Sequence, residues 1–307
     1  MVRAMDMGII QRVSEMKKTL YFIVAILAVI MAGCAGGKKV ADTQVIAEAN
    51  RLVDEKQYEA AMAKYLTLTN RQTWDSLTYR RATIAASKTE KDSLACRWGR
   101  MFSSAGDSEK LSALYQSMKR IGRTEDMADL VVDNTETFKT IIGGDETNAI
   151  VARAYAVRGD KRLIELYPEL TAAGVKAEVF DAYFKMAKTD LTESQARAKC
   201  QEILKAEPNQ KTALAYLGKV TYEKAEKEYA KTMNEYNKNK SQAAYAYMAR
   251  DLKRVVTPLY KESRDYFEKL RQLQPEDKNN LKYLINIYNR LENKTKAKEL
   301  EKLLNSK

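Results

Sequence analysis

The sequence contains three cysteines and no histidine, which limits the chemistry that its side chains can perform. Histidine is the commonest general base and metal ligand at neutral pH, so its absence argues against most acid–base and metal-centred mechanisms. The cysteines are Cys34, Cys96 and Cys200, and no two of them have the spacing of a redox or zinc motif. Cys34 stands apart because it directly follows an apolar segment.

That apolar segment, Leu20–Ala32, is thirteen residues long. A membrane-spanning helix needs about 20 apolar residues, whereas about 7 to 15 suit the core of a secretory signal peptide. Lys17 and Lys18 supply the positive charge that precedes such a core, and translation can start at Met1 or at Met16. We therefore expect residues 1–33 to be a signal peptide.

The end of the segment, Met31-Ala32-Gly33-Cys34, resembles the lipobox of bacterial lipoproteins, with methionine where leucine is more usual. The resemblance implies that Cys34 becomes the first residue of the mature chain and carries acyl chains such as palmitate. Several chains anchor a protein stably, whereas one gives marginal binding. The alternative is a plain secretory peptide with an incidental cysteine.

Residues 34–44 contain two glycines and two lysines and are predicted to form a flexible tether. Ala35 replaces the aspartate that tends to retain enteric lipoproteins in the inner membrane, and no acidic cluster follows Cys34. The lipoprotein resemblance therefore favours the outer membrane and its periplasm-facing side, and export makes nucleic acid an improbable partner.

The 274 residues from Cys34 onward have the composition of a helical protein. The chain is 45% hydrophobic but holds only 4 prolines and 12 glycines, and good helix formers dominate. Cys96 and Cys200 each lie within a helical pattern and are predicted to be buried thiols, with a single disulfide as the alternative. We identify no nucleophile–base arrangement, phosphate loop or metal-ligand set, and so predict no catalysis, no metal and no cofactor.

A recurring pattern of small, aromatic and proline residues resembles the tetratricopeptide repeat (TPR), a helix–turn–helix unit of about 34 residues. With Pro208 and Pro275 placed at the stop between repeats, residues along three stretches take the characteristic small and aromatic positions. These are Ala49, Leu52, Tyr58, Ala61 and Tyr65 near the start, Ala196, Leu214, Leu217 and Gly218 around Pro208, and Ser263, Phe267, Leu281, Leu284, Tyr288 and Ala297 around Pro275. Ile203 and Thr221 depart from the pattern.

The TPR resemblance implies an all-α, right-handed α-α superhelical solenoid of about seven helix pairs. We divide it into divergent repeats over residues 45–210 and a C-terminal TPR region over residues 211–307. Thr192 with Gln195 predicts a capping box that opens a helix. Turns are expected at Gly106-Asp107, Gly122-Arg123, Gly143-Gly144, Gly159-Asp160 and Gly174.

One repeat is predicted to be elongated, because 67 residues separate Pro208 from Pro275. The expected helices run over about residues 212–235 and 242–273, joined by a polar tip. Pro258 is expected to kink the second helix, or to restart it with Thr257 as N-cap. An apolar stripe on each helix predicts a coiled-coil-like seam rather than a sugar or peptide site, formed by Tyr222, Tyr229, Tyr236, Tyr245, Met248, Leu252, Val255 and Leu259.

Positive charge concentrates in the C-terminal region, where residues 211–307 hold 22 lysines and arginines against 13 aspartates and glutamates. A solvated helical surface explains such an excess, and attraction to an acidic partner is the functional alternative, with an acidic protein segment, lipid headgroups or an anionic glycan as candidates. In the last repeat, five residues are predicted to face a partner; the TPR resemblance places Lys282 and Asn286 on the inner face, and the other three lie nearby. The five residues are Asn279, Lys282, Asn286, Asn289 and Arg290.

These features together predict an outer-membrane-tethered TPR scaffold that mediates protein–protein interactions in the cell envelope. The alternatives are a glycan- or small-ligand-binding lipoprotein, or an assembly factor for outer-membrane proteins. Trp74 and Trp98 are the chain's two tryptophans and its best sugar-stacking platforms, yet both lie in core-like patterns.

Overall fold

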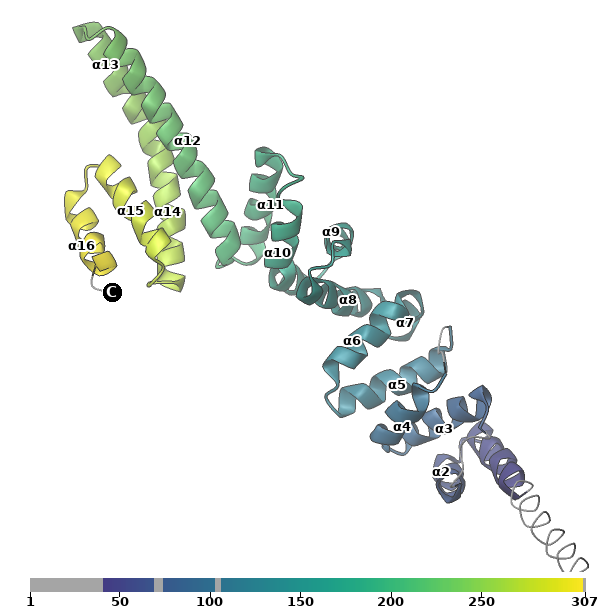
Figure 1. Ribbon diagram of the computed structural model, residues 1–307. Helices are drawn as coiled ribbons and strands as arrows, with labels where there is room; N and C mark the ends of the chain where they lie inside the picture. The colour runs from purple at the N-terminus through teal and green to yellow at the C-terminus, as the bar shows by residue number, and fades with distance from the viewer. Residues whose placement is uncertain (1–40, 69–73, 103–105, 306–307) are drawn as a thin grey trace, which may run out of the picture. The chain divides into compact units, whose positions relative to one another are not determined.

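The computed structural model describes residues 41–68, 74–102 and 106–305, and these residues fold into helices joined by short turns, with no strand among them (Figure 1). The predicted all-α fold is thereby confirmed. Cys34 and the predicted signal peptide lie outside the described residues. Residues 41–44, which we assigned to the tether, already belong to the first described helix, over residues 41–54.

The chain divides into two compact units, Met1–Gly143 and Gly144–Lys307. After its first helix, unit 1 contains α2 (Tyr58–Thr67), α3 (Ser76–Lys88), α4 (Asp92–Gly99), α5 (Ser108–Arg120), α6 (Thr124–Asp133) and α7 (Thr135–Ile141). Unit 2 contains α8 (Gly144–Arg158), α9 (Arg162–Leu166), the 3-10 turn η1 (Tyr167–Glu169), α10 (Ala173–Ala187), α11 (Glu193–Ala206), α12 (Lys211–Lys238), α13 (Gln242–Asp251), the π-helical turn η2 (Leu252–Val256), α14 (Thr257–Leu273), α15 (Lys278–Arg290) and α16 (Lys294–Asn305). The predicted division at residues 210 and 211 falls inside unit 2, at the turn between α11 and α12.

Five helix hairpins along the chain share one turn geometry. In each, a backbone N–H just past the end of the first helix donates to the carbonyl five residues earlier. The residue directly before this donor has a positive φ. This Schellman-type ending satisfies carbonyls that a helix end otherwise leaves unpaired. The accepting residues are Leu52, Ala86, Met118, Tyr155 and Tyr288. Leu52 and Ala86 are 34 residues apart, which is the TPR period.

The positive-φ residue is glycine in only two of these turns, Gly122 and Gly159, where the absence of a Cβ removes the strain. Lys56, Glu90 and Glu292 adopt the same conformation in the others. Gly106 and Gly143 also have positive φ, so the predicted turns there are confirmed. The turn predicted at Gly174 is wrong, because Gly174 lies in the first turn of α10.

The core of unit 1 is an aromatic cluster between the first helices. Tyr65, Trp74, Tyr79 and Trp98 are all buried, and neighbouring ring centroids lie 5.1 to 6.4 Å apart. Such tilted and edge-on arrangements are the favoured ones for aromatic pairs. Both tryptophans are therefore core residues, as their sequence context predicted.

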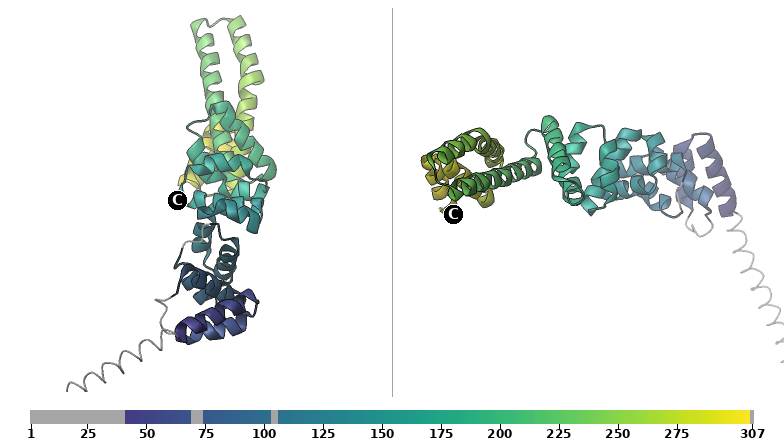
Figure 2. Two further views of the ribbon diagram at one scale, coloured as in Figure 1. Left: turned by 90° about the vertical axis from the view of Figure 1, so that its right-hand side faces the viewer. Right: turned by 90° about the horizontal axis from the view of Figure 1, so that it is seen from above.

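The elongated pair in unit 2 is confirmed, with α12 running antiparallel to the segment α13–η2–α14, so that the two rods rise side by side (Figure 2). The two rods pack closely at Gly218, where a Cβ would lie 3.0 Å from the Phe267 ring. Beside it the buried Ser263 hydroxyl donates to the Gly218 carbonyl oxygen at 2.7 Å. The small residues that the TPR resemblance singles out thus allow two backbones to approach closely.

Pro258 does not restart the helix with Thr257 as N-cap, contrary to one of our alternatives. Thr257 has helical φ and ψ of −57° and −44°, and its N–H donates to the Leu252 carbonyl five residues earlier. The π-helical turn η2 therefore joins α13 to α14 without a break. A proline ring clashes with the carbonyl four residues before it, and a widened turn is a known way to relieve that clash.

The extra residue in the π-helical turn changes which side chains form the predicted seam. Val256 is buried, whereas Val255, which we placed in the seam, is 45% exposed. Tyr222, Tyr229, Leu252 and Leu259 pack against the core as predicted. Near the tip Tyr245 touches Tyr236 but remains 57% exposed, and α13 has no buried residue.

Candidate partner-binding surfaces

The last helix hairpin carries the residues predicted to face a partner, and the structure leaves all five on the surface. Asn279, Lys282, Asn286, Asn289 and Arg290 lie along α15 and are exposed. The structure brings two of them, Asn289 and Arg290, into a cleft that other elements also line. Whether any of the five binds a partner stays a prediction.

Arg290 is engaged within the protein, which the sequence did not indicate. Its Nε and Nη2 donate to Glu226 Oε1 and Oε2 at 3.0 and 2.9 Å, and its guanidinium lies 4.0 Å from the centre of the Tyr229 ring. Tyr260 Oη donates to the same Glu226 Oε1 at 2.7 Å. We call these four side chains the Glu226 cluster. It joins α12, α14 and α15, so Arg290 holds the last hairpin against the elongated pair.

The charges of the Glu226 cluster are fixed by these contacts. Burial acts to raise the pKa of Glu226, but the hydrogen bonds from Arg290 and Tyr260 outweigh it and hold that pKa below its usual value. The hydrogen bond to Glu226 raises the pKa of Arg290. Burial, followed by the hydrogen bond to Glu226, raises the pKa of the Tyr260 hydroxyl. At neutral pH the cluster is therefore a closed ion pair.

A cleft of about 680 Å³ opens where the elongated pair rises past the end of α15, and we call it the hairpin notch. Its lining comes from α12, α13, η2, α14, α15 and the turn that follows α15. Tyr229, Leu252, Val256, Tyr260, Tyr288 and Leu291 supply its apolar and aromatic surface, and Lys253, Thr257, Lys261, Arg264, Asn289, Arg290, Glu292 and Asn293 its polar groups. Four cations and one carboxylate among these make the notch basic.

The cations of the hairpin notch are not equally available. Arg290 is paired with Glu226, and Arg264 donates to the adjacent Asp265 at 2.7 Å. Lys253 and Lys261 are both exposed, and among the described residues neither forms an ion pair. The notch therefore presents two ammonium groups above an apolar floor.

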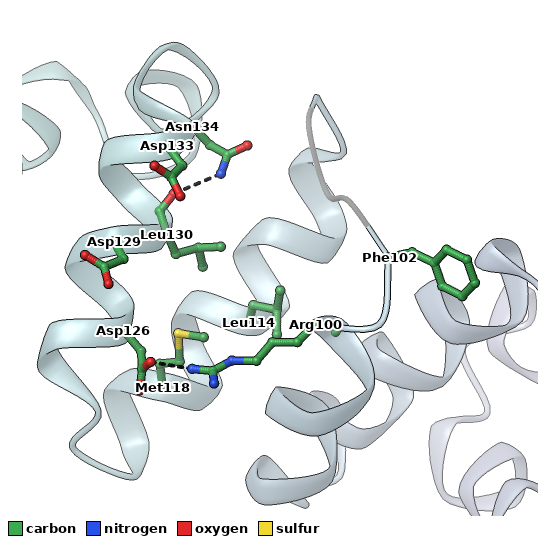
Figure 3. A pocket seen from close by; sticks show the side chains of 10 residues that line it. Arg100, Phe102, Leu114, Met118, Asp126, Asp129, Leu130, Asp133 and Asn134 are labelled. Atoms are coloured by element: carbon green, nitrogen blue, oxygen red, sulfur yellow. Dashed lines mark hydrogen bonds and ion pairs between the residues drawn. The ribbon is translucent and has the colours of Figure 1, made fainter.

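A second concavity, of about 480 Å³, lies in unit 1 between α4, α5 and α6 (Figure 3). Leu114, Met118 and Leu130 provide apolar lining, and carboxylates follow one side of α6. Figure 3 shows the Arg100 guanidinium reaching Asp126 across it. Asp126 also accepts from Arg123 at 2.5 Å, and although burial acts in the opposite direction these bonds hold its pKa below the usual value. An ion pair between Arg100 and Asp126 thus crosses this concavity.

The two described cysteines are buried, free thiols in different units. Burial raises the pKa of Cys200 to about 12 and also raises that of Cys96. A thiol is nucleophilic only as the thiolate, so neither side chain is poised for reaction at neutral pH. Among the described residues no group of His, Cys, Asp and Glu side chains is arranged to hold a metal ion.

Comparison with known proteins finds likenesses among solved structures only. No family model and no curated protein matches the chain. A solved structure of a TPR repeats protein from Bacteroides fragilis is similar at a TM-score of 0.29 and 16% identity, over 80% of this chain and 97% of that one. The TPR-like fold therefore rests on the hairpin packing and the repeated turn described above. In the part of the chain that the structure describes, no helix is both long and apolar enough to cross a bilayer.

Proposed function

We propose that the chain is a non-catalytic, TPR-like scaffold that binds other proteins and is held at the periplasmic face of the outer membrane by acyl chains on Cys34. The observation that supports the scaffold assignment is that packing and surface recognition use different residues of unit 2. The repeat residues are buried between packed helices. The hairpin notch, in contrast, is lined at the surface by polar and apolar side chains from six elements. Such a surface suits recognition of a chain segment.

The tethering part of the proposal is supported by sequence alone. The run Met31-Ala32-Gly33-Cys34 after a short apolar segment resembles a lipobox, and residues 1–40 lie outside the described structure. An outer-membrane position adds the requirement that partners come from the cell envelope. An assembly factor for outer-membrane proteins is one form of such a scaffold, and only analogy supports it.

Glycan binding loses its best sequence argument in the structure. Trp74 and Trp98 are 5% and 1% exposed, so neither ring offers a face to a sugar. The exposed aromatic side chains of α13, Tyr245 and Tyr247, stand on a convex tip instead of in a pocket. We therefore propose a protein partner in preference to a glycan.

Metabolic labelling with an alkyne analogue of palmitate tests the anchor. The wild-type chain is expected to incorporate the label and to sediment with outer membranes. Cys34→Ser is expected to lose both properties, while Cys200→Ser, the matched control, keeps them. A wild-type chain that takes up no label would refute the anchor.

Site-specific photo-crosslinking in cells tests the scaffold. A photoreactive amino acid at the exposed Asn289 of the hairpin notch is expected to give a defined protein adduct, and the same amino acid at the exposed Lys185 of α10 is expected to give none. The absence of adducts from the notch and from the rest of α15 would refute protein binding by this surface.

A further inference from the structure

The hairpin notch forms because the elongated pair is longer than the neighbouring hairpin of α15 and α16. The 28-residue α12 and the segment from α13 to α14 continue past the point where α15 ends, at Arg290. The turn Leu291–Asn293 then lies against the side of the elongated pair. Side chains that the next hairpin would cover in a uniform array are therefore left open along η2 and the start of α14.

Along one wall of the notch the polar residues form a regular stripe. Thr257, Lys261 and Arg264 are spaced four and three residues apart on one side of α14, and Lys253 of η2 lines the same notch. At a rise of about 1.5 Å per residue, the eight residues from Lys253 to Lys261 place their backbones about 12 Å apart. Both ammonium groups are exposed and form no ion pair with any described carboxylate, which leaves them available to external anions.

Apolar side chains lie beside the stripe and differ in how deeply they are buried. Val256 and Tyr260 are 2% exposed and form the floor, while Leu252 and Leu291 are only partly buried and line the walls. Apolar side chains left half-covered beside cations favour a ligand that brings both carboxylates and an apolar group. A bare anion would leave this apolar surface in water.

We propose that the hairpin notch binds an acidic segment of a partner protein, with an apolar side chain held between two carboxylates. This inference rests on the proposed scaffold function and specifies the partner's chemistry. An extended chain advances about 3.3 Å per residue, so four residues span the 12 Å between the two lysines. Alternate side chains of such a chain point the same way. The matching segment has an acidic residue, an apolar residue two positions on, and a second acidic residue two positions after that.

In this arrangement the two carboxylates pair with Lys253 and Lys261, and the apolar side chain enters between Leu252 and Leu291. Arg264 can extend the contact to a further acidic residue, since Asp265 holds it only from an exposed position. The Glu226 cluster stays intact beneath the ligand, because Arg290 is already paired with both carboxylate oxygens of Glu226. The affinity should fall steeply with salt, because at 0.1 M the Debye length is about 10 Å.

The test is a selection of random nonapeptides displayed on phage against the full-length chain, purified in detergent micelles. We expect enrichment of peptides with two acidic residues four positions apart and an apolar residue midway. The selected peptides, labelled with fluorescein, should bind Lys253→Glu/Lys261→Glu at least tenfold more weakly by fluorescence anisotropy. Lys231→Glu/Lys238→Glu is the matched control, because it makes the same charge change on exposed lysines of α12 outside the notch. Its binding should stay within twofold of the wild-type value.

Three results would overturn the inference: no enriched motif, an enriched motif without carboxylates, or equal binding to the Lys253→Glu/Lys261→Glu chain at unchanged helical circular dichroism. Sedimentation with vesicles that contain phosphatidylglycerol tests whether the notch binds lipid headgroups instead. If these two lysines govern vesicle sedimentation but not peptide binding, the notch recognises lipid headgroups and the peptide assignment fails. Loss of the palmitate label or of cellular adducts, with peptide binding retained, would instead remove the envelope scaffold and leave the notch chemistry intact.

Discussion

Replacing Glu226 with glutamine should loosen the attachment of the last hairpin to the elongated pair. The change keeps the shape of the side chain but removes the negative charge that Arg290 and Tyr260 share. One guanidinium then loses its carboxylate at the point where α12, α14 and α15 meet. Glutamine can still accept a hydrogen bond through its amide oxygen, so the contacts of the cluster are weakened but not all lost.

The size of the effect follows from how exposed the cluster is. A hydrogen bond to a charged group contributes about 1.5 to 3 kcal/mol when buried, and an exposed ion pair contributes about 0 to 1 kcal/mol. The Arg290 and Glu226 side chains are 36% and 30% exposed, which places the pair between these limits. We expect Glu226→Gln to cost about 1.5 kcal/mol of local stability, which is about a tenfold change in an opening equilibrium.

Hydrogen exchange followed by mass spectrometry can measure this locally. Amides of α12, α14 and α15 that exchange through opening of the hairpin should exchange about tenfold faster in Glu226→Gln at pH 7. Amides of α3 and α4, in the other unit, provide the internal reference and should not change. In a double-mutant cycle with Arg290→Gln, the second change should cost much less than it does alone.

The effect should also depend on pH in a defined direction. The pKa of Glu226 is lowered in the folded chain, so its ionised form stabilises the fold. That stabilisation is complete above the unfolded value of about 4.3 and is lost as the pH falls through the folded pKa. The stability difference between the wild type and Glu226→Gln should therefore shrink below about pH 4. A change under twofold at pH 7, or an equal difference at low pH, would refute this account.

Two further predictions concern packing and thiol burial. Gly218→Ala should destabilise unit 2 by about 1 kcal/mol, because the new methyl group meets the Phe267 ring and the strain outweighs the gain in helix propensity. Gly174→Ala, where no atom lies within 4 Å of the new methyl group, should leave stability unchanged or raise it; urea unfolding followed by circular dichroism compares the two. The thiol of Cys200, with a pKa of about 12, should resist iodoacetamide at pH 8 in the folded chain and react after unfolding, and rapid alkylation before unfolding would contradict its burial.

The sequence predicted the parts of this fold that depend on residue size. Gly218, Ser263 and Phe267 were identified from their repeat positions, and the structure places them in one tight contact. The capping box of Thr192 and Gln195 is present as predicted. Small and aromatic residues, like caps, act through short-range sterics and local hydrogen bonds, so their positions can be recognised without knowing what lies opposite.

Features that depend on long-range contacts or on backbone adjustment were not predictable. Arg290 was singled out as a residue for a partner, but its carboxylate partner, Glu226, lies 64 residues away and follows no periodic rule. The turns at Lys56, Glu90 and Glu292 were missed because the backbone geometry is that of a glycine turn while the residue type is not. The turn at Gly174 was predicted wrongly because the residue type is typical of turns while the backbone there is helical.

The π-helical turn has a consequence for how the elongated pair can change. A residue added to a helix rotates everything beyond it by about 100°, since 3.6 residues make one turn. Deleting one residue between Leu252 and Val256 would turn the outer part of the rod relative to its base and carry Tyr245 and Tyr247 to another side of the molecule. Loss or gain of one residue at this turn would thus redirect α13 while the Glu226 cluster keeps α14 and α15 in place on α12.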